Sequence, residues 1–61
     1  MPEPVFEMTK DQAGKFRFRL IAENGQVVAV SEAYSGKQSC EDGIKSVKEN
    51  ALKAKIKDLT K

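Results

Sequence analysis

Few side chains of this sequence have the chemistry of a catalytic group, and Cys40 is the first to consider. A nucleophilic cysteine needs a base or a cationic neighbour to lower its pKa, and the chain contains no histidine. Cys40 shares helical spacing with Ile44 and Val47, and unpaired cysteine is among the most often buried residue types. We therefore expect Cys40 to be an inert core thiol.

Other catalytic and metal-binding patterns are also missing. Glu41 and Asp42 are neighbouring carboxylates in a helical segment, where adjacent side chains do not face each other. The four glycines are dispersed and form no phosphate-binding loop. One cysteine without histidine cannot supply the ligands of a structural zinc site. The sequence predicts no catalytic, cofactor-binding or metal-ligating residue.

Arg17 and Arg19 flank Phe18, and arginines interleaved with aromatic residues on a sheet are typical of RNA-binding proteins. In a strand, however, Phe18 points to the face opposite the two arginines. We expect Arg19 to lie opposite Glu7 and Arg17 to lie opposite Glu32, since cross-strand pairs of opposite charge are favourable. This interpretation gives a solvated ion-pair face.

Ser31 and Tyr34 lie near the predicted junction of sheet and helix. We expect Ser31 to project towards the core face, where a loop or helix-end backbone group must satisfy its hydroxyl. A ligand site would need more converging polar groups than these two.

Lysines are concentrated at the C-terminus. Residues 45–61 carry six lysines against Glu49 and Asp58, whereas residues 1–44 carry five basic and seven acidic side chains. Such lysines can contact the phosphates of a nucleic acid, but on an edge strand they also prevent uncontrolled sheet pairing. The candidate nucleic-acid contacts are Lys53, Lys55, Lys57 and Lys61.

Two turn signals organise the first half of the chain. Asn24-Gly25 predicts a two-residue type I′ hairpin turn with positive φ at both positions, and Gly14 predicts a three-residue loop that ends in a left-handed residue. The two registers place one set of residues on the core face of a three-stranded antiparallel meander. The core face comprises Phe6, Met8, Phe16, Phe18, Leu20, Ala22, Val27 and Ala29.

A helix is expected next. Ser35 and Gln38 form a predicted capping box at its start, and Asn50 can end it in the left-handed conformation. Gly43 lies beside the apolar stripe, where a missing side chain allows the helix to approach the sheet closely. The stripe consists of Cys40, Ile44, Val47 and Ala51.

The last ten residues fit two conformations. Apolar residues alternate with lysines from Leu52 to Lys57, as in a half-buried strand, yet Leu52, Ile56 and Leu59 also stand at helical spacing. The pattern leaves strand and helix both open. The apolar members of this segment are our candidate dimer interface: Leu52, Ala54, Ile56 and Leu59.

The length of 61 residues allows one domain, 1–61, with a loose N-terminus at 1–4. A domain this small is marginally stable and usually depends on disulfides, metal or oligomerisation. A single cysteine excludes the first, the ligand count excludes the second, and we therefore expect a homodimer. We see neither a signal peptide nor a membrane span, and with one unpaired cysteine the expected compartment is the cytoplasm.

The chain resembles the YegP-like family of uncharacterised bacterial proteins. The residues that carry the resemblance are Phe6-Glu7-Met8, Lys10-Asp11, Ala13-Gly14-Lys15-Phe16-Arg17-Phe18-Arg19-Leu20, Asn24-Gly25, Ser31-Glu32-Ala33-Tyr34-Ser35, Gly43-Ile44, Ser46-Val47-Lys48 and Asn50-Ala51. The resemblance implies a β-β-β-α unit with a short final strand, and two such units, as a dimer or a tandem repeat, that join around a shared sheet. It implies no activity. The family often has proline at the position of Leu52, and its absence here weakens the case for a strand at 53–58.

These observations predict an α+β fold, β-β-β-α-β, that pairs with a second subunit around a shared sheet. We expect a non-enzymatic structural or interaction module of unknown biological role that acts as a homodimer. The alternative is a weak, non-specific nucleic-acid binder that uses the lysine-rich C-terminal segment. No small-molecule substrate or cofactor is indicated.

Overall fold

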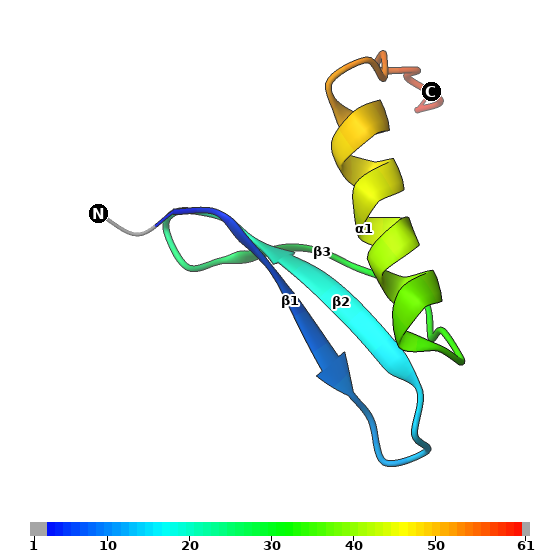
Figure 1. The fold of residues 1–61 in the computed structure, drawn as a ribbon. Helices are drawn as coiled ribbons and strands as arrows, with labels where there is room; N and C mark the ends of the chain where they lie inside the picture. The colour runs from blue at the N-terminus through cyan, green and yellow to red at the C-terminus, as the bar shows by residue number, and fades with distance from the viewer. Residues whose placement is uncertain (1–2, 61) are drawn as a thin grey trace.

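The computed structural model describes residues 3–60 as a three-stranded antiparallel sheet with one helix (Figure 1). The strands follow one another in the order β1-β2-β3, as in the predicted meander. The elements are β1 (Val5–Lys10), β2 (Phe16–Ile21), β3 (Val27–Val30) and α1 (Lys37–Ala51). The α+β class is confirmed. Residues 1–2 of the predicted loose N-terminus, together with Lys61, lie outside the described residues.

The first hairpin has the predicted three-residue loop. The N–H of Asp11 donates to the carbonyl of Lys15 at 2.8 Å, and the N–H of Gly14 donates to the carbonyl of Asp11 at 3.0 Å. Gly14 has φ of 82°, a conformation that glycine adopts without steric cost. The register of β1 with β2 is therefore as predicted, with Phe6 opposite Leu20 and Met8 opposite Phe18.

The second hairpin differs from the prediction. The N–H of Ala22 donates to the carbonyl of Gln26, and the N–H of Gly25 to the carbonyl of Ala22, both at 2.8 Å. Within residues 3–60, positive φ occurs only at glycine, so Asn24 lacks the left-handed conformation of a type I′ turn. The turn has three residues, like the first, because this loop needs positive φ only at Gly25 and the Asn24 side chain accepts the Gln26 N–H at 3.0 Å.

The longer loop moves the start of β3 by one residue. Val27 lies opposite Ile21, where we expected Ala22, and a register shift between Leu20 and Ile21 then restores the predicted pairing of Leu20 with Ala29. Residues paired across a sheet share a face. Val27 is therefore on the outer face of the sheet, away from the helix, and its assignment to the core face was wrong.

The helix begins one residue later than predicted. Its N-cap is Gly36, in an extended conformation and without a side-chain hydrogen bond to the helix, so Ser35 is not the cap. The amide of Gln38 donates to the Asp42 carboxylate at 3.0 Å, one turn along the helix, and this competes with the capping box.

The helix continues past Asn50, which we expected to end it. It runs to Ala51, with Leu52 as a C-cap in right-handed conformation. The Asn50 amide donates to the carbonyl of Ser46 at 2.8 Å, so its side chain stabilises the last turn instead of terminating the helix.

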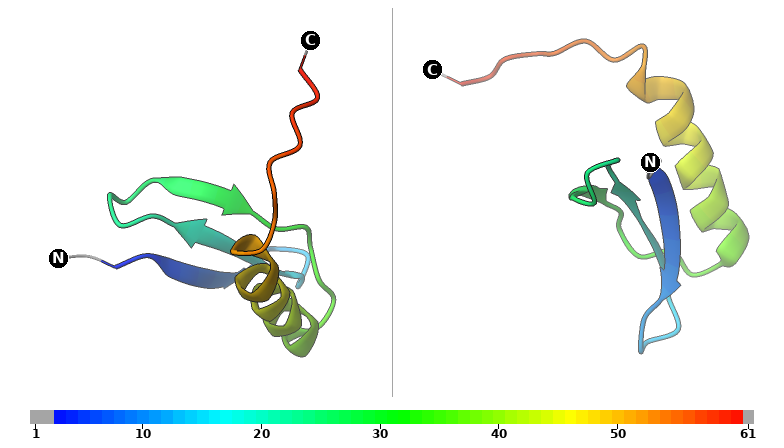
Figure 2. Two further views of the ribbon diagram at one scale, coloured as in Figure 1. Left: turned by 90° about the horizontal axis from the view of Figure 1, so that it is seen from above. Right: turned by 90° about the vertical axis from the view of Figure 1, so that its left-hand side faces the viewer.

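The helix packs on one face of the sheet (Figure 2), and its close approach depends on Gly43. A Cβ at Gly43 would lie 2.5 Å from the Tyr34 hydroxyl and 3.1 Å from Cε2 of Phe18. The rings of Phe18 and Tyr34 stack with centroids 6.2 Å apart. The predicted packing reason for a helical glycine is confirmed.

Candidate functional site

Cys40 is on the core face of α1, as predicted, and is completely buried. Burial raises the pKa of its thiol, and the negative charge of Glu41 raises it further. A raised pKa leaves less of the nucleophilic thiolate at neutral pH. Cys40 therefore has the burial and electrostatics of a structural residue.

Residues 3–60 contain no cluster of histidine, cysteine or carboxylate side chains that could hold a metal ion. No helix in this range is long and apolar enough to cross a membrane.

The outer face of the sheet carries the two arginines in ion pairs. Arg19 binds Oε1 of Glu7 through Nε at 2.9 Å and Nη2 at 2.8 Å, as predicted. Arg17 binds the Asp11 carboxylate at 3.1 Å, so the predicted pairing with Glu32 is wrong. The ladder beyond β3 is irregular and does not bring Glu32 opposite Arg17, whereas Asp11 follows directly after β1 on the same face.

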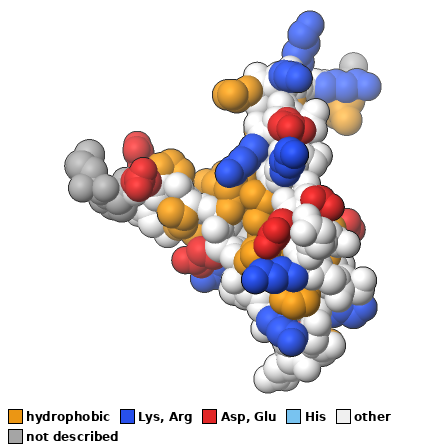
Figure 3. Space-filling view, in the orientation of Figure 1, with side chains coloured by type: hydrophobic (Ala, Val, Ile, Leu, Met, Phe, Trp, Pro, Cys, Tyr) orange, Lys and Arg blue, Asp and Glu red, His pale blue; other side chains and the backbone are white. Residues whose placement is uncertain are grey.

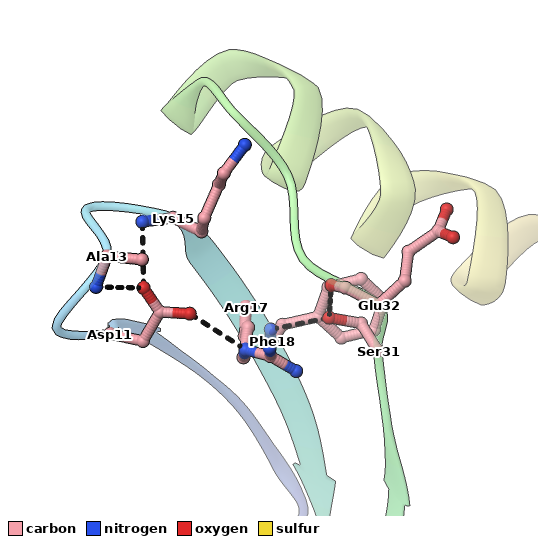
Figure 4. A network of polar contacts seen from close by, with 7 residues as sticks. All are labelled: Asp11, Ala13, Lys15, Arg17, Phe18, Ser31 and Glu32. Atoms are coloured by element: carbon pink, nitrogen blue, oxygen red, sulfur yellow. Dashed lines mark hydrogen bonds and ion pairs between the residues drawn. The ribbon is translucent and has the colours of Figure 1, made fainter.

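Asp11 also organises the first loop (Figure 4). Its Oδ1 accepts the N–H groups of Ala13 and Lys15, each at 2.9 Å, while Oδ2 accepts Nε of Arg17. These donors, the Lys15 N–H first and Arg17 next, lower the pKa of the Asp11 carboxyl. The prediction missed this network, although aspartate at the start of a glycine-containing turn is its usual sequence signal.

Ser31 completes the ladder where β3 ends. Its hydroxyl accepts the N–H of Phe18 at 2.8 Å and donates to the carbonyl of Glu32 at 2.7 Å (Figure 4). Beyond it, Tyr34 pairs with Phe16 through two main-chain hydrogen bonds of 2.7 Å. Main-chain groups thus satisfy Ser31, as expected, although they come from β2 and the following loop.

An open hollow of about 240 Å³ lies beside Ser31 and is lined mainly by outer-face residues of the sheet. Both arginines that line it already bind carboxylates of the same face, so it lacks the free converging polar groups of a ligand site. Its lining residues are Thr9, Arg17, Phe18, Arg19, Val30 and Ser31.

Apolar surface remains uncovered on the core face of the sheet and on the C-terminal tail, residues 53–60. Phe18 and Cys40 are the buried hydrophobic residues of the described chain, and the rest of the core face is half-buried or exposed. Figure 3 shows hydrophobic side chains along the boundary between helix and sheet. The half-buried residues of the sheet include Phe6, Met8, Phe16 and Leu20.

The tail extends away from its own sheet without helix or strand (Figures 1 and 2). Leu52 is 94% exposed, Ile56 97% and Leu59 77%, and Ala54 is exposed as well. Lys53, Lys55 and Lys57 are exposed on the same segment, and Lys61 lies outside the described residues. The candidate interface residues and the described candidate phosphate contacts thus lie on one segment, 52–59, which belongs to no strand within residues 3–60.

A family model described as a domain of unknown function (DUF1508) matches residues 11–58. A UPF0339 protein of Methanosarcina acetivorans is 55% identical over 51 residues, which cover 84% of this chain and 88% of the relative. The UPF0339 protein YegP of Escherichia coli is 46% identical over 46 residues, or 75% of this chain and 42% of YegP.

A solved structure, the NMR solution structure of a protein from Haloferax volcanii, has the same fold. Its TM-score is 0.82 at 41% sequence identity, with 95% of this chain and 98% of that chain covered. The relatives therefore include archaeal proteins, so the family is wider than the bacterial group that we expected. None of the names of these matches refers to an enzymatic activity. The family model matches most of the chain, and the relatives include both bacterial and archaeal proteins. The chain therefore belongs to the uncharacterised DUF1508 family.

Proposed function

We propose that this protein is a non-enzymatic structural or interaction module that acts as a cytoplasmic homodimer. Residues 53–58 of each chain form a strand on the sheet of the partner and complete a β-β-β-α-β unit. Exchange of identical segments between two copies gives a closed assembly with twofold symmetry.

The exposed apolar tail is the observation that carries this proposal. Leu52 and Ile56 are more than nine-tenths exposed, and on the core face of the sheet Phe6 and Phe16 are only half-buried. Large exposed apolar surfaces mark interaction sites in soluble proteins. A partner covers both surfaces at once.

The energetics favour covering both surfaces over ordering the tail alone. Fixing six residues in a strand costs about 6–12 kcal/mol of backbone entropy. Burying Ile56 in this strand and Leu52 just before it stabilises by about 3–6 kcal/mol in total, which does not exceed this cost. Formation of the strand therefore requires ladder hydrogen bonds and burial of half-exposed core residues in the same step.

The longer relatives agree with such an arrangement. This chain matches only 42% of the length of Escherichia coli YegP, so that protein has room for a second unit of similar size. A second unit in one chain can take the place of a second subunit.

Two observations support the non-enzymatic part of the proposal. Cys40 is buried, and the carboxylates of Glu7 and Asp11 are each bound by an arginine. The cytoplasm fits a protein whose single thiol has no disulfide partner within the chain, since thiols remain reduced there.

Truncation tests the proposal. Sedimentation of the intact chain at micromolar concentration should give a dimer, and removal of residues 53–61 should give a monomer or aggregate. A control that removes only residues 60–61, which are not part of the candidate interface, should remain dimeric. An intact chain that sediments as a stable monomer contradicts the homodimer.

The same samples separate the nucleic-acid alternative. Binding of single-stranded nucleic acid that weakens steeply with added salt, and that is lost when Lys53, Lys55 and Lys57 are replaced by glutamine, would favour phosphate contacts.

A further inference from the structure

We propose that the tail strand of the partner adds to the free edge of β1, and not to that of β3. This inference rests on the homodimer proposed above and names the surface that receives the exchanged segment. In the order β1-β2-β3, both outer strands have one edge without a partner among the described residues.

The regularity of the two edges differs. β1 pairs with β2 over six consecutive residues without interruption, and its length equals that of segment 53–58. β3 has only three paired residues, with a register shift between Leu20 and Ile21 that leaves Val28 without a partner on β2. A bulged strand bends and twists, which is how natural sheets block pairing at an edge. β1 is therefore the better template.

Charge favours the same edge. If the apolar residues of the tail face the core, its lysines lie on the outer face, where β1 presents Glu7. Both contacts of Arg19 use Oε1 of Glu7, and Oε2 has no partner within residues 3–60. A carboxylate accepts several hydrogen bonds, so a lysine can join this ion pair. Along β3 the lysines would lie beside Val27 and Val30 instead, which offer no charge.

The inner side of β1 also needs cover. Phe6 and Met8 are half-buried at the margin of the sheet, with the Phe6 ring packed edge-on against Phe18 at 5.9 Å. Tail residues Ala54 and Ile56 have the alternation that places them beside these side chains. The inner side of β3 offers only the small Ala29.

The alternation predicts one cross-strand pair. The tail has three lysines, and β1 has three outer-facing residues, Val5, Glu7 and Thr9. When the two sets are aligned, the middle lysine, Lys55, lies opposite Glu7 whether the strands run parallel or antiparallel. Directly opposed residues on neighbouring strands have Cα atoms about 4.5–5.5 Å apart, within the range of a disulfide.

Cross-linking tests the pair. The variant Glu7→Cys/Lys55→Cys should form a covalent dimer on mild oxidation, visible on a non-reducing gel. The matched control Val30→Cys/Lys55→Cys places its cysteine on exposed β3 and should remain uncross-linked. Lys55→Cys alone controls for links between the two tails. Glu7→Cys removes only an exposed ion pair, so the fold is retained.

Each outcome has one meaning. A covalent dimer with Glu7→Cys and none with Val30→Cys supports the β1 edge. Cross-linking through Val30→Cys, or none in a chain that sediments as a dimer, overturns this inference and leaves the homodimer standing. A chain that sediments as a monomer overturns the homodimer itself.

A measurement without introduced cysteines gives the second test. Lys55→Glu should raise the dimer Kd by about 2- to 30-fold, since each dimer loses two exposed pairs. Adding Glu7→Lys to that variant should restore most of the affinity. The exposed helix variant Lys45→Glu should leave the Kd unchanged, and an equal effect at both positions contradicts a specific pair.

Discussion

Replacing Gly43 by alanine inserts one methyl group at the closest contact between helix and sheet. The new Cβ would lie 2.5 Å from the Tyr34 hydroxyl oxygen, 2.9 Å from its Cζ and 3.1 Å from Cε2 of Phe18. The first two distances are shorter than any stable contact, and Tyr34 cannot retreat freely because its main chain is paired with Phe16. Either the ring or the helix must move.

The magnitude is a difference between two effects. Alanine gains about 1 kcal/mol over glycine in a helix interior, while overpacking of a filled core costs about 1–3 kcal/mol. We expect Gly43→Ala to lower the free energy of unfolding by about 1 kcal/mol, against a helix propensity that alone would raise it. Removing the nearest atom with Tyr34→Phe should recover part of the loss in the double variant.

Urea unfolding measures the free energy of unfolding of Gly43→Ala, Tyr34→Phe and the double variant. All are compared at one protein concentration, because the stability of an oligomer depends on concentration. Lys45→Ala, an exposed helix position, is the control and should change stability by less than about 0.5 kcal/mol. A Gly43→Ala variant that is more stable than the wild type, or effects of the two substitutions that simply add, would refute the close approach of Gly43 to Tyr34.

Three further predictions concern the thiol, a turn and an ion pair. Cys40 should react slowly with a thiol reagent in the folded protein and quickly after denaturant is added; rapid labelling at neutral pH would show that its helix face is exposed. Gly14→Val should destabilise the fold in urea by about 1–2 kcal/mol, because φ of 82° strains any side chain although nothing lies within 4 Å of the new Cβ; unchanged stability would contradict the loop. The pKa of Asp11 is below its ordinary value of 3.8 in the folded state, so its contribution is present above that value and is lost as the pH falls through the lower, folded pKa. Asp11→Asn should therefore reduce the loss of stability between about pH 6 and about pH 2.5, and identical pH profiles would exclude that role.

The sequence by itself determined the parts of the fold that depend on strong local preferences. Gly14 fixed the first loop, because only glycine adopts its backbone conformation readily, and this loop set the register that places Glu7 opposite Arg19. The helical period of the apolar stripe correctly placed Cys40 in the core. Gly43, unfavourable within a helix, correctly indicated a close contact.

Tertiary structure decided between alternative conformations that differ little in local free energy. Asn24-Gly25 is compatible with two loop lengths, and the choice of three residues moved Val27 to the other face of the sheet. The carboxylate that binds Arg17 depended on where the irregular ladder ends and where Asp11 emerges from its turn.

The tail is the extreme case. Residues 53–60 carry both strand and helix periodicity, and the described chain gives them neither conformation. Alternating Leu52, Ala54 and Ile56 specify which side chains are to be buried, but a strand also needs an edge to supply its hydrogen bonds. The conformational entropy lost on ordering this backbone is offset only by contacts outside the segment, so local sequence cannot determine its conformation.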